Sequence, residues 1–124
     1  MTKADQKAEE RAEKKRVCDR IVAQLNQVTP AIARAMFGGY GIYAEGVMFA
    51  LIAYNTLYFK VDDGNRPDYE ALGLSPFTYD GKGKPIQMSY YQAPPDLFED
   101  VPRLAEWVEK AQAAARRAKR KKSR

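Results

Sequence analysis

The sequence predicts an α+β domain of two layers, in which helices pack on one face of a five-stranded antiparallel sheet. The chain has 124 residues, which is the ordinary size of one domain, and 45% of them are hydrophobic. Short apolar stretches are separated by turns that contain glycine, as in β-hairpins. Helical patterns begin, interrupt and end this series. The predicted element order is therefore α-β-β-β-α-β-β-α.

Residues 4–27 are predicted to form the first helix. Its first half, "ADQKAEERAEKKR", consists of good helix formers without a large apolar side chain. An apolar face begins at Val17 and continues through Ile21 and Leu25 at a spacing of four residues. We therefore expect residues 1–16 to be a charged segment that projects from the domain or frays, and residues 17–115 to form the domain itself.

The five strands are predicted from period-two alternation and from continuous apolar runs. Residues 31–36 are expected to be extended without being counted as a strand. The run "VMFALIAY" is apolar on both faces, as in a central strand. The predicted strands are residues 40–44, 47–54, 57–61, 77–79 and 86–91.

Two further helices are predicted from capping signals. Asn65 is expected to N-cap a short helix with Pro67 in its first turn, and Gly73 to end it. Asp100 is expected to N-cap the last helix. The apolar stripe of that helix contains Leu104, Val108, Ala111 and Ala115, with Trp107 beside it.

One face of the sheet is expected to remain uncovered, because the predicted helices pack on the other. We predict that this face carries Tyr58, Lys60, Gln87 and Ser89 together with apolar side chains. A half-apolar open face is a candidate surface for dimerisation or for a protein partner.

Three glycines, Gly38, Gly39 and Gly41, lie in the stretch "MFGGYG". A phosphate-binding glycine loop precedes a helix, whereas this stretch precedes a predicted strand and matches no nucleotide-binding pattern. The three glycines are therefore interpreted as structural, serving a bulge, a positive φ angle or a close approach between strands.

Residues that carry common enzyme chemistry are scarce. The chain has no histidine, which excludes histidine-dependent nucleophile pairs, and its one cysteine, Cys18, is expected to be a small buried hydrophobe. The acidic pairs Asp62-Asp63 and Glu99-Asp100 could bind a divalent ion, but each is better placed for capping. No catalytic residue, cofactor or metal is predicted. An enzyme that uses carboxylates and tyrosines in a dimer cleft stays as an alternative.

The chain carries a net charge of +5, and the charge is concentrated at its C-terminus. The last fourteen residues contain seven basic side chains and no acidic one, and residues 116–124 are predicted to be a basic tail. Clustered lysines and arginines neutralise phosphates without sequence preference. The candidate residues for binding DNA or RNA are Arg116, Arg117, Lys119, Arg120, Lys121, Lys122 and Arg124. The alternative is a solvated terminus that aids solubility.

Aromatic residues on a sheet can also stack bases, but the eight tyrosines are better explained by packing.

The compartment is predicted from cysteine usage and hydropathy. A single cysteine forms no internal disulfide, which favours a reducing, cytoplasmic compartment. The N-terminus lacks an apolar signal-peptide core, and no run approaches the roughly 18 apolar residues of a membrane span. No membrane association is therefore expected.

Several motifs together resemble one family. They are "RAMFGGYGIYAEGVMFALI", "LYFKVDD", "PFTYDGKGKPIQMSYYQAP" and "LAEWVEKA", and they extend from about Ile21 to Ala115. These motifs are similar to the N-terminal domain of the TfoX/Sxy proteins, of which this chain would be a short, stand-alone member. The resemblance implies an α+β domain with an antiparallel sheet, similar to secretion-chaperone-like folds.

The best-known members of that family regulate natural competence, together with the cyclic-AMP receptor protein at promoters. The resemblance therefore implies a small non-enzymatic domain for regulation or protein interaction, with the transcription machinery as a possible partner class. We expect a homodimer, with non-specific nucleic-acid affinity supplied by the tail. A chaperone-like protein binder that uses the exposed sheet face is the alternative.

Overall fold

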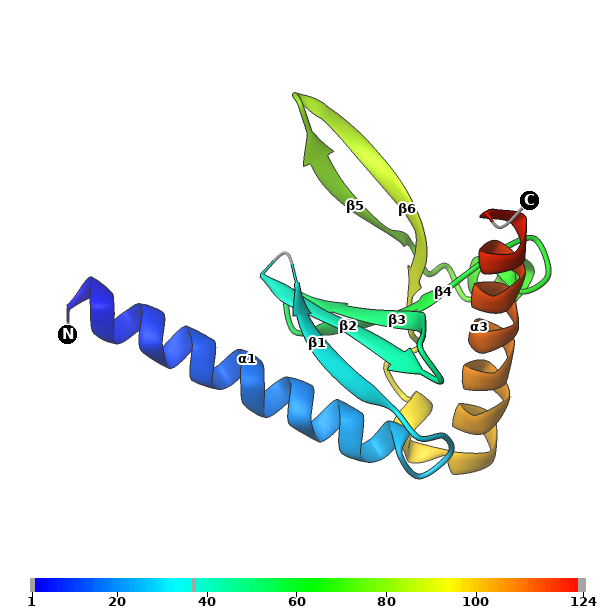
Figure 1. Ribbon diagram of the computed structural model, residues 1–124, viewed down its shortest axis with the longest axis horizontal. Helices are drawn as coiled ribbons and strands as arrows, with labels where there is room; N and C mark the ends of the chain where they lie inside the picture. Colours follow the sequence, from blue (N-terminus) through cyan, green and yellow to red (C-terminus); the bar gives the residue numbers. More distant parts are fainter. Residues whose placement is uncertain (1, 37, 123–124) are drawn as a thin grey trace.

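A computed structural model describes residues 2–36 and 38–122 and shows an antiparallel sheet with helices on one face (Figure 1). The predicted α+β class is confirmed, but the sheet has six strands instead of five. Their order across the sheet is β1-β2-β3-β4-β6-β5. The strands are β1 (Ile32–Met36), β2 (Gly39–Ala44), β3 (Val47–Ala53), β4 (Thr56–Lys60), β5 (Pro76–Gly81) and β6 (Lys84–Gln92).

The additional strand is β1, which lies in the segment that the sequence indicated only as extended. Its residues, "IARAM", include two alanines, which strands disfavour, so local propensity gives little signal. Pairing with β2 forms the strand, in a register that runs from Ile32 opposite Tyr43 to Met36 opposite Gly39. The predicted element order was therefore wrong at this point, and the 3-10 helix η1 (Leu97–Glu99) also went unpredicted.

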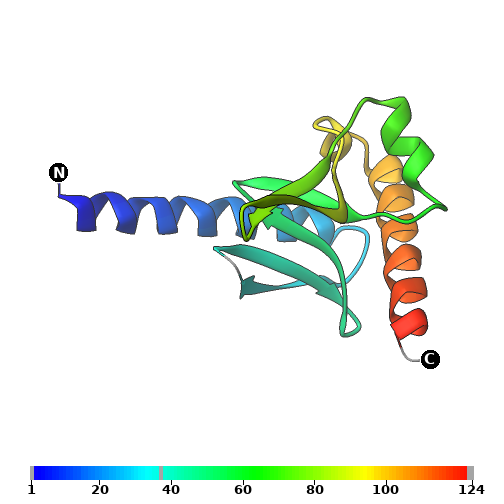
Figure 2. The same cartoon turned by 90° about the horizontal axis from the view of Figure 1, so that it is seen from above.

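Helix α1 (Lys3–Leu25) extends well beyond the sheet, and Figure 2 shows its N-terminal half projecting from the domain. Thr2 N-caps it in a capping box with Asp5. Every residue from 2 to 16 is exposed, whereas Cys18, Ile21 and Leu25 are buried. Only the C-terminal half of the helix therefore packs on the sheet, while the charged half is a regular helix in solvent.

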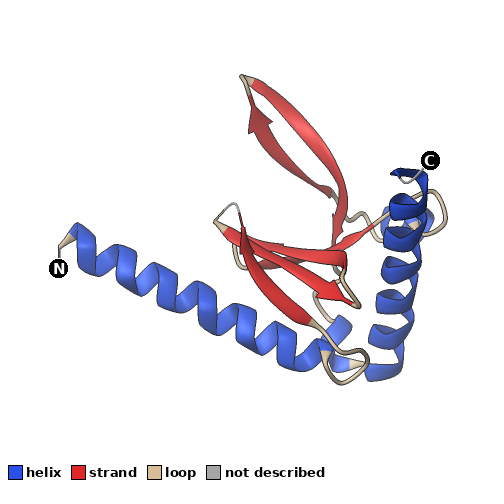
Figure 3. Cartoon of the chain, in the orientation of Figure 1, coloured by secondary structure: helices blue, strands red, loops and turns tan. Residues whose placement is uncertain are grey.

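Helices α2 (Arg66–Ala71) and α3 (Val101–Lys122) complete the helical layer (Figure 3). Asn65 precedes α2 as predicted, but its side chain does not cap the helix. Its Oδ1 instead accepts from the backbone of Asp62 at 2.8 Å, and its Nδ2 donates to the carbonyl of Lys60 at 3.1 Å. Asn65 is almost fully buried, and its amide oxygen and amide nitrogen both find hydrogen-bond partners within the loop after β4, which they hold closed.

The core lies between the helices and one face of the sheet. Phe49 and Phe59 stack there with ring centroids 6.5 Å apart, and the ring centroids of Tyr69 and Trp107 lie 4.7 Å apart in an edge-to-face arrangement. Leu104, Val108, Ala111 and Ala115 of α3 are all buried, as their stripe predicted. Both long helices contribute to this single cluster, which leaves the opposite face of the sheet without a helix.

Candidate functional site

The uncovered face of the sheet, here called the outer face, carries an apolar groove. The groove has a volume of about 460 Å³, within the range of ligand sites. We call it the outer groove. Its walls come from β1, β3, β5 and β6, which supply Met36, Met48, Leu51, Phe77, Tyr79 and Met88. The β5–β6 hairpin bends away from the plane of the other four strands (Figure 1), and the lining residues come from both parts of the sheet.

Two glycines, Gly39 and Gly41, allow neighbouring atoms to approach the backbone of β2 closely beneath the outer groove. A Cβ atom on Gly41 would lie 2.7 Å from the Met36 methyl carbon and 3.1 Å from the Met48 sulfur, so both methionines lie directly over this backbone. A Cβ on Gly39 would lie 2.1 Å from the carbonyl oxygen of Ile52, which no side chain tolerates. Gly38 has a φ of +76°, a conformation that favours glycine. The stretch begins strand β2, not a helix, so it has no phosphate-binding geometry.

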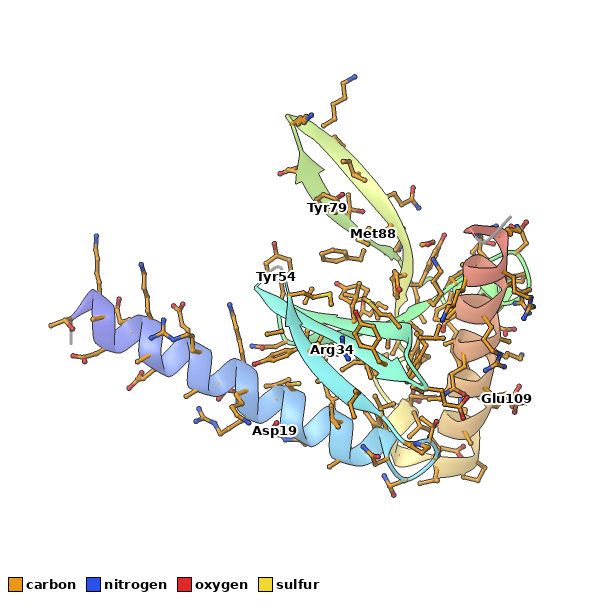
Figure 4. All side chains as sticks on the ribbon, in the orientation of Figure 1. Asp19, Arg34, Tyr54, Tyr79, Met88 and Glu109 are labelled. Carbon is orange, nitrogen blue, oxygen red and sulfur yellow. The ribbon has the colours of Figure 1, made fainter. Side chains whose placement is uncertain are left out.

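Aromatic rings form one side of the groove. Phe77 packs edge-on against Tyr58 at 5.1 Å between centroids and lies 6.4 Å from the rings of both Tyr54 and Tyr79. Figure 4 shows Tyr79 and Met88 on the β5–β6 hairpin, with Tyr54 across from them. Tyr54 and Tyr79 both line the groove and remain accessible to solvent, with exposed fractions of 83% and 43%. The pKa of Tyr58 is raised, mainly by burial and secondarily by Tyr54.

The charge on the outer face is cationic. Among the described residues that line the outer groove, Lys14 of α1 is the charged one. Lys14 forms no ion pair with any residue in the ranges 2–36 and 38–122. On the sheet itself, the guanidinium of Arg34 lies 5.1 Å from the centroid of the Tyr43 ring, and the Lys60 ammonium lies 5.0 Å from that of Tyr90. Strands β1 to β4 contain no acidic residue.

The predicted residues of this face are only partly right. Tyr58 and Lys60 lie on it, but the register places Tyr90 opposite Lys60, so alternation along β6 puts Met88 and Tyr90 on the outer face. Gln87 therefore belongs to the other face, whereas Ser89 Oγ accepts a hydrogen bond from Lys60 Nζ at 2.5 Å and so lies beside Lys60 as predicted. Pairing irregularities in the β5–β6 hairpin make this alternation hard to infer from sequence.

The predicted nucleic-acid-binding residues lie in the last turns of α3 as far as Lys122. Arg116, Lys119, Arg120 and Lys121 are exposed there. Arg117 is different, because its guanidinium is used inside the fold in a two-point contact with the carboxylate of Asp62. Arg124 lies outside the described residues, and of Lys122 the structure describes the backbone alone.

The other candidates for chemistry have structural roles. Asp62 Oδ1 accepts from the backbone of Gly64 at 2.9 Å, and Asp100 Oδ1 accepts from that of Arg103 at 3.1 Å. Cys18 is buried, and burial raises the pKa of its thiol. In the described part of the chain, no three His, Cys, Asp or Glu residues gather to hold a metal ion. No described helix combines the length and the apolarity that crossing a membrane requires.

Fold and groove together define a small α+β domain with a helical layer on one face of its sheet and an open, apolar, cation-bearing face on the other. The model of the TfoX N-terminal domain matches residues 23–115 of the 124-residue chain, and the chain belongs to this family. The matched span begins inside α1 and ends inside α3, so it covers the whole sheet. No curated protein matches the sequence.

Proposed function

We propose that this TfoX N-terminal domain is a non-enzymatic protein-interaction module whose binding site is the outer groove. The observation that carries the proposal is the groove itself, whose apolar walls a folded domain would otherwise cover with a helix or a second sheet. Aromatic and methionine side chains are also the residue types that protein interfaces favour. The family supports a regulatory role for the module, linked to transcription.

Site-specific photo-crosslinking in cells tests this proposal. A photoreactive amino acid replaces Tyr54 or Tyr79 at the mouth of the groove, and Leu72 in the control. Leu72 follows α2, is 50% exposed and does not line the groove. We expect one and the same protein adduct from residues 54 and 79, and none from residue 72. The proposal would be contradicted by equal adducts at all three residues, or by the absence of adducts at both groove residues.

A second function, non-specific nucleic-acid binding, is favoured by the exposed basic residues of α3. Arg116, Lys119, Arg120 and Lys121 lie on consecutive turns without an acidic residue among them. Such a cluster adds electrostatic affinity for phosphates. It would hold the module near DNA while the groove binds a protein, which is how the two functions combine in a transcription-linked role.

Homodimerisation through the outer face is a competing use of the same surface. Its test is the mass of the protein in solution by light scattering over a concentration series. A dimer that Tyr54→Glu dissociates would assign the groove to a second copy of the chain. A monomer at all concentrations would leave the groove for a different partner.

A further inference from the structure

We propose that the outer groove takes an extended, acidic peptide segment of a partner protein, which adds as a strand to the free edge of β5. The inference rests on the proposed protein-binding function and specifies its ligand: a strand whose alternate side chains enter the groove, most of them apolar and one of them Asp or Glu.

The strand edge is the first observation. β5 is the last strand of the sheet and pairs with β6 alone. Residues 78–80 are exposed, and no backbone hydrogen bond of the described chain reaches the outer edge of residues 76–81. An exposed strand edge presents N–H and C=O groups that an extended peptide can pair with.

The alternation of side chains is the second observation. Phe77 and Tyr79, two residues apart on β5, both line the groove. A strand that pairs with β5 would place every second side chain on this same face. Met36, Met48 and Met88 form adaptable walls for those side chains, since methionine fits apolar groups of varied shape.

Charge is the third observation. Lys14 is the charged lining residue, and strands β1 to β4 carry bases without acids. The turn between β5 and β6 contains Lys82 and is followed by Lys84. Asp80 is the one acidic residue in the six strands. A basic segment would be repelled at this surface, whereas an acidic one would be attracted and oriented.

A second copy of the chain fits this description poorly. The exposed half of α1 has no large apolar side chain to place in the groove. The acidic and apolar segment Asp96–Asp100 has its Leu97 fully buried in the core. Of the six strands only β5 carries an acidic side chain, and its own Phe77 and Tyr79 already line the groove.

The test is a selection of short random peptides displayed on phage, using the full-length protein as target. We expect the selected peptides to carry apolar residues at alternate positions, with Asp or Glu at one of these same groove-facing positions, where it meets Lys14. Lys14→Glu should weaken their binding at least about tenfold, because it reverses the charge at the groove. Lys7→Glu is the matched control, since it makes the same change two turns away on the same side of α1, at an exposed residue that does not line the groove.

Strand addition has its own readout. Two N-methylated versions of a selected peptide are compared, one methylated at its odd-numbered residues and one at its even-numbered residues. One version should lose binding and the other should keep it, because only one of these two sets of N–H groups would face β5. The inference would be overturned by selected peptides without acidic residues or by equal effects of the two lysine variants. It would also be overturned if both N-methylated versions of the peptide still bound. A selection that enriches no peptide would overturn it as well. In each case a partner crosslinked through Tyr54 and Tyr79 would leave the proposed function standing.

Discussion

Arg117 and Asp62 form a two-point ion pair that joins the last turns of α3 to the loop after β4. Arg117 Nε donates to Oδ2 of Asp62 at 2.6 Å, and its Nη2 donates to Oδ1 at 2.8 Å. The contact links residues 55 positions apart in the sequence. Part of the basic segment therefore belongs to the fold, and the remaining exposed bases form a smaller candidate surface.

Arg117→Ala should lower the free energy of unfolding by about 1 kcal/mol, the size expected for a two-point pair that solvent partly screens. Arg117→Lys should lose most of the same energy, because an ammonium cannot donate in the same two-point geometry. Urea denaturation measures both changes. Arg116→Ala is the control, since Arg116 is exposed and has no ion pair in the described chain. Equal stability of the Arg116 and Arg117 variants would contradict this role.

The same pair predicts how stability depends on pH. Hydrogen bonds from Arg117 hold the pKa of Asp62 below its ordinary value of 3.8. A carboxyl with a lowered pKa contributes stability above its unfolded pKa and loses it as the pH falls through the folded pKa. The stability advantage of the wild type over Asp62→Asn should be constant above about pH 5 and shrink below about pH 4. Urea denaturation at a series of pH values measures it, and an advantage that grows towards acid pH would refute the assignment.

The glycines should differ in their tolerance of a methyl group. Gly39→Ala should cost at least about 2 kcal/mol of stability, because its Cβ collides with the backbone of Ile52. Gly41→Ala should cost about 1 kcal/mol or less, because the atoms it meets are the ends of flexible methionine side chains. Thermal or urea unfolding decides the order. A Gly41 variant less stable than the Gly39 variant would show that the groove floor is packed differently.

The exposed bases of α3 should set the salt dependence of nucleic-acid binding. Fluorescence anisotropy with a DNA duplex over a salt series measures the slope, which is about −0.9 per neutralised phosphate. Replacing Lys119, Arg120 and Lys121 by alanine should flatten the slope towards zero. Arg117→Gln should change it little, because Asp62 already neutralises that side chain. The surface is misassigned if Arg117→Gln has the larger effect.

The helices and the central strands could be predicted from the sequence because their signals are local. The spacing of Ile21 and Leu25 and the stripe through Leu104 and Val108 are periodic patterns that packing preserves. Strand β1 could not be predicted in this way, since its alanines become a strand only through pairing with β2. Asn65 had the right residue type for a cap, but the loop after β4 uses its amide instead.

The open, half-apolar face was predicted, whereas the groove was not. The groove requires the bend of the β5–β6 hairpin, where the register of β5 against β6 shifts between residues Pro76 and Thr78. The approach of Lys14 also depends on the angle at which α1 crosses the sheet, and no local pattern encodes that angle. What the sequence did contain was the methionines and aromatic residues that line the groove, without the geometry that brings them together.

The most direct measurement uses the methionines that line the groove, because Met36, Met48 and Met88 are all the methionines after Met1. The protein is labelled on its methionine methyl groups, and NMR spectra are recorded with and without the partner recovered by crosslinking. Single Met→Leu variants assign the resonances. We predict that the signals of Met36, Met48 and Met88 shift or broaden on binding. A partner that binds, as judged by light scattering, while these three signals stay unchanged would contradict the assignment of the outer groove as the binding site.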